Sequence, residues 1–133
     1  KEGAALCKRL AKFNPEIKFD KILVDAPCSG EGTLRSAYKT YKMWNIKNVT
    51  KALPQIQKRL FKHAFEILKV DGEIIYSTCT HAPEENEAIV SWALEEFGDK
   101  IKIKKNRFYN KLCLLHRVFW CQTNKRRKLE CWC

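Results

Sequence analysis

The 133-residue sequence has no apolar run near the roughly 20 residues that a membrane-spanning helix requires. Its basic beginning, Lys1–Leu10, also lacks the apolar stretch of a secretory signal peptide. Glycine is scarce, at five residues, and neither an internal repeat nor a low-complexity segment occurs. We therefore expect an intracellular protein with no membrane partner, in the cytoplasm, nucleus or nucleolus, and with one core.

Disulfide and zinc signatures are missing as well, although the sequence has seven cysteines. The number is odd, C-x-x-C pairs are absent, and intracellular thiols stay reduced. We predict no metal site. The less favoured alternative is metal binding by the C-terminal tail, whose possible ligands lack the paired spacing of structural zinc. These residues are Cys113, His116, Cys121, Cys131 and Cys133. The cysteines are therefore candidates for core residues or nucleophiles.

Acidic residues are nearly absent from the C-terminal quarter. Residues 101–133 contain ten Lys/Arg and one acid, Glu130, whereas residues 1–100 contain sixteen Lys/Arg and fourteen acids. A basic segment on a near-neutral body favours contact with nucleic-acid phosphates. A solvated or disordered charge run explains the charge equally well.

Apolar periodicity predicts strands and helices in alternation. Lys1–Phe13 has the spacing of a short helix, and Lys21–Asp25 reads as a buried strand before a loop at Ala26–Gly32. A longer helix follows Thr50 and ends at Val70-Asp71-Gly72. Its predicted apolar face consists of Leu53, Ile56, Leu60, Ala64 and Leu68.

A second strand, Glu73–Thr78, is followed by a turn at Cys79–Pro83 and by a helix that stops at Gly98. Strands that alternate with helices predict an α/β fold with a parallel sheet. Ligands bind outside the carboxyl ends of such strands. Asp25–Cys28 and Thr78–Cys79 each follow a strand, so we expect both loops to open on one crevice.

Three residues stand out because they converge on this edge: Asp25, Cys28 and Cys79. Taken singly, a cysteine is usually a small buried residue, and an aspartate after a strand is often a turn or cap residue. Cys79 precedes a helix, whose N-terminus favours a thiolate, although Glu84 and Glu85 offset part of that effect. Two thiols and a carboxylate suit methylation at C5 of a pyrimidine, because a thiolate that adds to C6 makes C5 nucleophilic. A redox dithiol pair is the alternative.

Two stretches resemble the catalytic motifs of the NSUN and Sun/Fmu RNA cytosine-5 methyltransferases. The first is F-D-K-I-L-V-D-A-P-C-S-G-E-G-T-L-R at Phe19–Arg35. The second is L-K-V-D-G-E-I-I-Y-S-T-C-T at Leu68–Thr80, followed by P-E-E-N-E at Pro83–Glu87. The similarity covers about residues 19–97. Other positions that match the family are Trp44 and Leu53–Leu60 with Gln57.

This resemblance implies a Rossmann-like methyltransferase fold with a mostly parallel sheet, of which the chain supplies the second half. It implies that Cys79 is the attacking thiol and that Cys28 is needed for release. It also implies that Asp25 contacts both the target cytosine and the cofactor, S-adenosylmethionine, and that Arg35 contacts the substrate. The implied partner is RNA, either tRNA or rRNA.

The resemblance has gaps on both sides of the motifs. Nothing before Phe19 resembles the family's glycine-rich donor loop, since Gly3 is the only glycine before Gly30 and no G-x-G-x-x-G occurs. Val70-Asp71-Gly72 stands where the family usually has Pro-Gly-Gly. We therefore expect these 133 residues to bind the donor weakly by themselves.

The C-terminal part also diverges from the family. Arg117-Val118-Phe119 resembles a late family strand, but Trp120 onward does not continue it. We divide the chain into a catalytic-motif half, residues 1–100, and a basic, cysteine-containing segment, residues 101–133.

The predicted function is transfer of a methyl group from S-adenosylmethionine to C5 of a cytosine in tRNA or rRNA, through a covalent adduct between Cys79 and C6. The alternative is a non-catalytic RNA-binding fragment without the donor-binding half, and a thiol redox protein is a third candidate. The motif pair favours the enzyme, whereas the missing donor loop favours the fragment.

Overall fold

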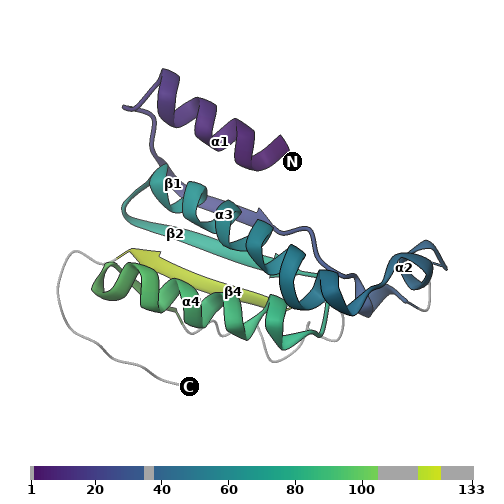
Figure 1. Ribbon diagram of the computed structural model, residues 1–133. Coiled ribbons are helices and arrows are strands. Elements are labelled where there is room, and N and C mark those ends of the chain that lie inside the picture. Colours follow the sequence, from purple (N-terminus) through teal and green to yellow (C-terminus); the bar gives the residue numbers. More distant parts are fainter. Residues whose placement is uncertain (1, 35–37, 105–116, 124–133) are drawn as a thin grey trace.

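The computed structural model describes residues 2–34, 38–104 and 117–123 (Figure 1). The longer elements are α1 (Glu2–Phe13), β1 (Phe19–Asp25), α2 (Tyr38–Met43), α3 (Leu53–Glu66), β2 (Leu68–Thr78), α4 (Glu87–Phe97), β3 (Ile101–Ile103) and β4 (Arg117–Thr123). Single turns of helix are η1 (Glu31–Thr33), η2 (Asn48–Ala52), η3 (Pro83–Glu85) and η4 (Gly98–Lys100).

The four strands form one sheet in the order β1-β2-β4-β3. β1 and β2 are parallel neighbours, which confirms the predicted pairing of the two motif-bearing strands and the α/β class. β4 runs antiparallel to both β2 and β3, and such a strand is common beside parallel ones in α/β sheets. β4 also continues beyond Phe119, because Trp120 pairs with Ile75 and the strand runs to Thr123.

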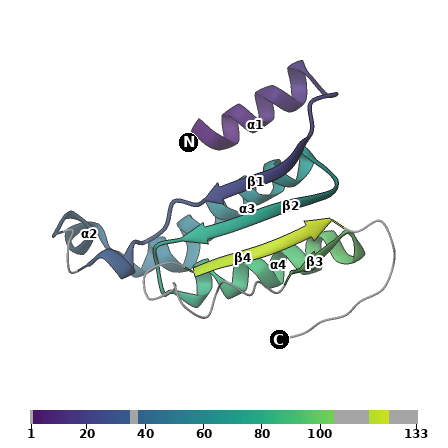
Figure 2. The same cartoon turned by 180° about the vertical axis from the view of Figure 1, so that it is seen from behind.

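Helices α3 and α4 cover one face of the sheet, and α1 packs against α3 (Figure 1). From behind, the strands lie in front of both helices, and no helix of the described ranges covers this second face (Figure 2). Side chains alternate accordingly, since Val24 and Tyr76 are buried under the helices whereas Leu23 is 66% exposed.

Helix α3 begins with Pro54 in its first turn, where the missing N–H disrupts no helical hydrogen bond. Its buried residues are spaced by three and four positions: Pro54, Gln57, Phe61 and Ala64. The predicted face was therefore rotated by about one position, and Leu53, Ile56 and Leu60 are only half-buried.

The predicted end of this helix at residues 70–72 was wrong, because α3 ends at Glu66. The carbonyl of Ile67 accepts the backbone N–H of Phe19 at 2.9 Å, so the chain leaves the helix there to pair with β1. Leu68 therefore opens β2 and does not extend the helical face. The second strand is accordingly longer than the predicted Glu73–Thr78.

The start of β2 is irregular. Phe19 pairs with Leu68 and Lys21 pairs with Glu73, so residues 69–72 bulge out of register. Within the bulge Asp71 has a positive φ of 63°. This is the segment in which Val70-Asp71-Gly72 departs from the family pattern.

Aromatic rings join α3 to α4 inside the core. Phe65 and Phe97 stack with their centroids 4.1 Å apart, and Phe61 meets Trp92 edge-on at 6.5 Å. Helix α4 ends at Gly98, as predicted, with a φ of 52°.

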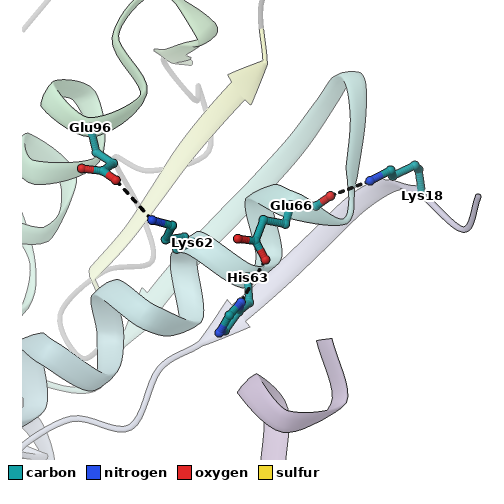
Figure 3. Close-up of polar contacts among 5 residues, drawn as sticks. All are labelled: Lys18, Lys62, His63, Glu66 and Glu96. Atoms are coloured by element: carbon teal, nitrogen blue, oxygen red, sulfur yellow. Dashed lines mark hydrogen bonds and ion pairs between the residues drawn. The ribbon is translucent and has the colours of Figure 1, made fainter. Parts of the chain in front are cut away.

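Polar contacts at the outer edge of this core are drawn in Figure 3. Lys62 of α3 pairs with Glu96 of α4 at 3.5 Å, and His63 lies 3.0 Å from Glu66. Lys18 donates to the Glu66 carbonyl at 2.7 Å, which ties the end of α3 to the segment before β1. None of the helices in the described ranges combines the length and the apolar character needed to cross a membrane.

Candidate active site

Two loops meet at the carboxyl ends of β1 and β2, where Asp25 pairs with Ser77 in the sheet. The first loop carries Cys28 and the second begins with Cys79. Their Sγ atoms lie 3.0 Å apart, and the Cys79 backbone N–H donates to Cys28 Sγ at 3.2 Å. The predicted juxtaposition of the two cysteines is thus confirmed.

The Cys28 thiol is in an environment that keeps it protonated. Burial, followed by the hydrogen bond with Cys79, raises the pKa of Cys28 from 9.0 to about 12. Because Cys28 Sγ already accepts the Cys79 N–H, its own hydrogen can point at the Cys79 sulfur. The geometry therefore suits Cys28 as a thiol donor and Cys79 as the acceptor.

The Cys28 loop is fixed by hydrogen bonds to two fully buried side chains from other elements, Glu85 and Gln57. The Ser29 N–H donates to both carboxylate oxygens of Glu85, at 3.2 Å and 3.0 Å. Gln57 Nε2 donates to Glu85 Oε2 at 2.8 Å and to the Pro27 carbonyl at 3.0 Å. The residues on either side of Cys28 are thus fixed by one carboxylate–amide pair.

The Cys79 loop is held mainly by Asn86, which is also fully buried. Asn86 Oδ1 accepts the Thr78 hydroxyl at 2.6 Å. Asn86 Nδ2 donates to the carbonyls of Thr80 at 3.2 Å and Ala82 at 2.8 Å. One amide side chain therefore supports the chain on both sides of Cys79.

The two loops are also bonded to each other. The hydroxyls of Ser29 and Thr80 lie 2.7 Å apart, and the Gly32 N–H donates to the Cys79 carbonyl at 3.0 Å. In the first loop Gly30 has a φ of 72°, and a Cβ there would lie 3.0 Å from Thr40 Cγ2 of α2. Both the left-handed backbone and the close contact with α2 favour glycine at this position.

The other two predicted site residues are Asp25 and Arg35. Asp25 is exposed at the end of β1, where Oδ1 accepts the Ser77 hydroxyl at 3.1 Å. Arg35 lies outside the described residues. Most of the basic tail and the side chains of the cysteines in that tail also lie outside them. In the described ranges, no three His, Cys, Asp or Glu residues are grouped so that they could hold a metal ion.

Sequence reasoning missed the supporting roles of Gln57, Glu85 and Asn86. It placed Cys79 at a helix N-terminus, but α4 begins only at Glu87, after residues 80–86 and η3. It also treated Glu85 as a helix-start acid, whereas the carboxylate is buried beneath the Cys28 loop. A glutamine in the otherwise apolar stripe of α3 was the available signal.

Two cysteine loops at the ends of adjacent parallel strands, covered on one face by helices, define a Rossmann-like methyltransferase core. The family model of the 16S rRNA methyltransferase RsmB/F matches residues 5–114. The chain belongs to this family.

Curated relatives agree with the family assignment. The chain is 42% identical over 90 residues to the multisite-specific tRNA:(cytosine-C(5))-methyltransferase of Saccharomyces cerevisiae, and the aligned part covers 68% of this chain and 13% of the relative. It is 42% identical over 96 residues to the ribosomal RNA small subunit methyltransferase F of Aeromonas salmonicida, covering 72% and 20%. The chain thus spans a fifth or less of these relatives.

Solved structures show the same fold. NSun6 from Pyrococcus horikoshii superposes with a TM-score of 0.68 at 25% identity and covers 88% of this chain and 33% of its own. A methyltransferase homologue from the same organism gives a TM-score of 0.61 at 25% identity, covering 86% and 42%.

Proposed function

We propose that the chain carries the RNA-reactive part of a methyltransferase that acts at C5 of a cytosine in tRNA or rRNA. The observation that carries the proposal is the 3.0 Å contact between the Cys28 and Cys79 sulfurs at the ends of adjacent parallel strands. The names of the relatives, which act on tRNA cytosine-C5 and on small-subunit rRNA, support the substrate class.

In the first step the Cys79 thiolate adds to C6 of the cytosine. The new S–C6 bond shifts the π electrons of the C5–C6 bond into a C4–C5 double bond, and N3 takes up a proton from solvent, so C5 becomes enamine-like and nucleophilic. The exposed Asp25 carboxylate lies at the end of β1, from which it can bind the N3/N4 edge of the ring. S-adenosylmethionine, when bound, supplies an electrophilic methyl group at C5.

Release reverses the addition. After methyl transfer N3 returns its proton to solvent. A water molecule then acts as the base that removes the C5 proton, the electrons of that bond re-form the C5–C6 double bond, and the S–C6 bond breaks with its electron pair returning to the Cys79 sulfur. Cys28, kept protonated by its raised pKa, donates its S–H toward the departing sulfur. Cys28 therefore acts in release and Cys79 in attack.

The described residues fit S-adenosylmethionine only in part. Asp25 offers one exposed carboxylate at the strand end, and it already accepts one hydrogen bond from Ser77. The two positive-φ glycines of the described ranges are Gly30, which lies against Thr40 of α2, and Gly98, which ends α4. We therefore assign Asp25 as a donor contact and place the rest of the donor site outside these elements.

The test is covalent trapping, in a protein that joins this chain to a donor-binding half. Wild-type protein, Cys79→Ala and Cys28→Ala are each incubated with S-adenosylmethionine and with total tRNA or small-subunit rRNA. Cys79→Ala should abolish methyl transfer and leave no RNA adduct. Cys28→Ala should form the adduct but release it slowly, so RNA-linked protein should accumulate on denaturing gels.

Two results would contradict this division of roles. Trapping in the Cys79 variant and none in the Cys28 variant would reverse the assignment. Loss of activity in both variants without trapping would leave a shared site with no separate attack and release residues. Thr33→Ser, a mild change in the same loop, is the matched control for general disturbance of the site.

The alternative function, RNA binding without catalysis, also has an observation in its favour. Residues 32–65 contain eight Lys/Arg and no Asp or Glu. A chain that binds RNA with strong salt dependence but never forms an adduct, even when joined to a donor-binding half, would establish this alternative.

A further inference from the structure

The segment that follows the Cys28 loop exposes aromatic rings to solvent. Tyr38 and Tyr41 on α2 are each 69% exposed, and Trp44 is 41% exposed. The two tyrosine rings stack on each other, with centroids 6.4 Å apart and planes inclined by 22°. The aromatic residues of α3 and α4 mostly fill the core, so a group of exposed rings suggests a ligand with flat faces.

Lysines surround these rings. Lys42 Nζ lies 5.0 Å from the Tyr38 ring centre, and three further exposed lysines follow the same segment: Lys39, Lys47 and Lys51. None of the ion pairs within the described ranges involves these four lysines. Lys62, by contrast, pairs with Glu96 (Figure 3), and Lys69 pairs with Asp20.

The exposed rings are connected to the cysteine site through Glu31. Trp44 Nε1 donates to Glu31 Oε1 at 2.9 Å, and Thr80, the residue after Cys79, donates to Glu31 Oε2 at 3.4 Å. α2 lies beyond the carboxyl ends of β1 and β2, at the same end of the sheet as the two cysteine loops (Figure 1). A polymer whose reacting base sits at Cys79 would pass over this segment.

We propose that Tyr38, Tyr41 and Trp44, with Lys39, Lys42, Lys47 and Lys51, form a stacking surface for single-stranded RNA next to the target cytosine. The rings would stack on unpaired bases, and the lysines would contact the phosphates between them. The proposal rests on the proposed function for the identity of the target, and on charge complementarity for the choice of RNA over a protein partner.

The experiment measures RNA affinity of the 133-residue chain, which needs no methyl donor. The probe is a fluorescein-labelled single-stranded RNA of about 12 nucleotides with one cytosine, followed by anisotropy at several salt concentrations. Tyr38→Ala/Tyr41→Ala should weaken binding about tenfold for each ring that stacks on a base. Tyr38→Phe/Tyr41→Phe should bind like wild type, because phenylalanine keeps the stacking face.

The chain offers a matched control at Phe13. This ring is 71% exposed and has Lys12 Nζ 5.9 Å from its centre, but it ends α1, at the opposite end of the sheet from α2 (Figure 1). Phe13→Ala should leave RNA affinity unchanged. Lys39→Gln/Lys42→Gln should reduce the salt dependence by about 0.7 in log–log slope for each phosphate that is no longer neutralised.

The outcomes separate this surface from the catalytic proposal. The affinity measurement contains no methyl donor and compares variants outside the cysteine loops, so a defect in methyl transfer does not imitate a defect in binding. An equal loss for Phe13→Ala and the tyrosine double variant, an unchanged affinity in the double variant, or no salt-dependent binding by the wild-type chain would each overturn the stacking surface. If RNA binding depends on the two tyrosines but the chain joined to a donor-binding half never methylates RNA, the stacking surface is upheld and the proposed methyltransferase activity is refuted.

Discussion

The two cysteine loops are held in different ways. The Cys28 loop depends on side chains that are distant in sequence, since Ser29 and Glu85 are separated by 56 positions. The Cys79 loop depends on Asn86, which is within eight positions of every backbone or hydroxyl group that it contacts. Adjacent buried residues, Glu85 and Asn86, therefore each support a different cysteine.

This difference indicates which sulfur is sensitive to the packing of the helices. Moving α3 displaces Gln57, which bonds both Pro27 and Glu85, and so shifts the Cys28 loop, whereas Asn86 keeps its own hydrogen bonds to the Cys79 loop. In the proposed reaction the attacking sulfur is thus on the locally fixed loop, and the releasing sulfur is on the loop that responds to its surroundings.

The largest effect is expected for Glu85→Ala. It leaves the Ser29 N–H unpaired and takes one acceptor from Gln57 in a fully buried place, which should lower the free energy of unfolding by about 3 kcal/mol or more. Urea denaturation measures the loss. Hydrogen exchange should show a deprotected Ser29 amide. Glu84→Ala, on the neighbouring half-buried side chain, should change stability by only about 0.5 kcal/mol.

A somewhat smaller loss, about 2–3 kcal/mol, is expected for Asn86→Ala, because three neutral hydrogen bonds disappear. The discriminating measurement is again hydrogen exchange, in which amides of the Cys79 loop should lose protection while the Ser29 amide keeps it. Thr78→Val, which removes one of the three bonds, should cost about 1 kcal/mol. Identical exchange patterns for Glu85→Ala and Asn86→Ala would abolish the distinction between the loops.

The strands and helices could be predicted because apolar periodicity and loop residues mark them locally. The end of α3 could not, because Leu68 continues the spacing from Ala64 although it already belongs to β2. Cys28 and Cys79 could be brought together from topology alone, since both follow parallel strands.

The supports of the site could not be predicted, for a physical reason. Glu85 follows Glu84 near a helix start, where solvent-exposed acids are common, and only the distant Ser29 and Gln57 make its burial favourable. The lysines of the stacking surface are not evident from the net charge of residues 1–100, because acids elsewhere in that range cancel them.

A moderate effect is expected in the reactivity of Cys28. Its pKa of about 12 leaves little thiolate at pH 8, so iodoacetamide should modify it at least about tenfold more slowly in the native chain than in urea, as followed by peptide mass spectrometry. The folded state holds this proton more tightly than the unfolded state, so stability should fall as pH rises from about 9 to about 12. Cys28→Ala should flatten that fall; an unchanged pH dependence would assign it to other groups.

The smallest effect is expected at the opposite end of β2, where neither loop should be disturbed. Asp71 has a φ of 63°, a conformation that glycine adopts without strain, so Asp71→Gly should raise the free energy of unfolding by about 0.5 kcal/mol. Gly72→Ala is the opposing control, because its Cβ would lie 2.9 Å from the Lys69 carbonyl and should destabilise the chain by about 1–3 kcal/mol. Both variants should leave the alkylation rate of Cys28 unchanged. A changed rate would show that the bulge and the cysteine loops are coupled along β2, and the contrast between a locally held and a distantly held loop would then be incomplete.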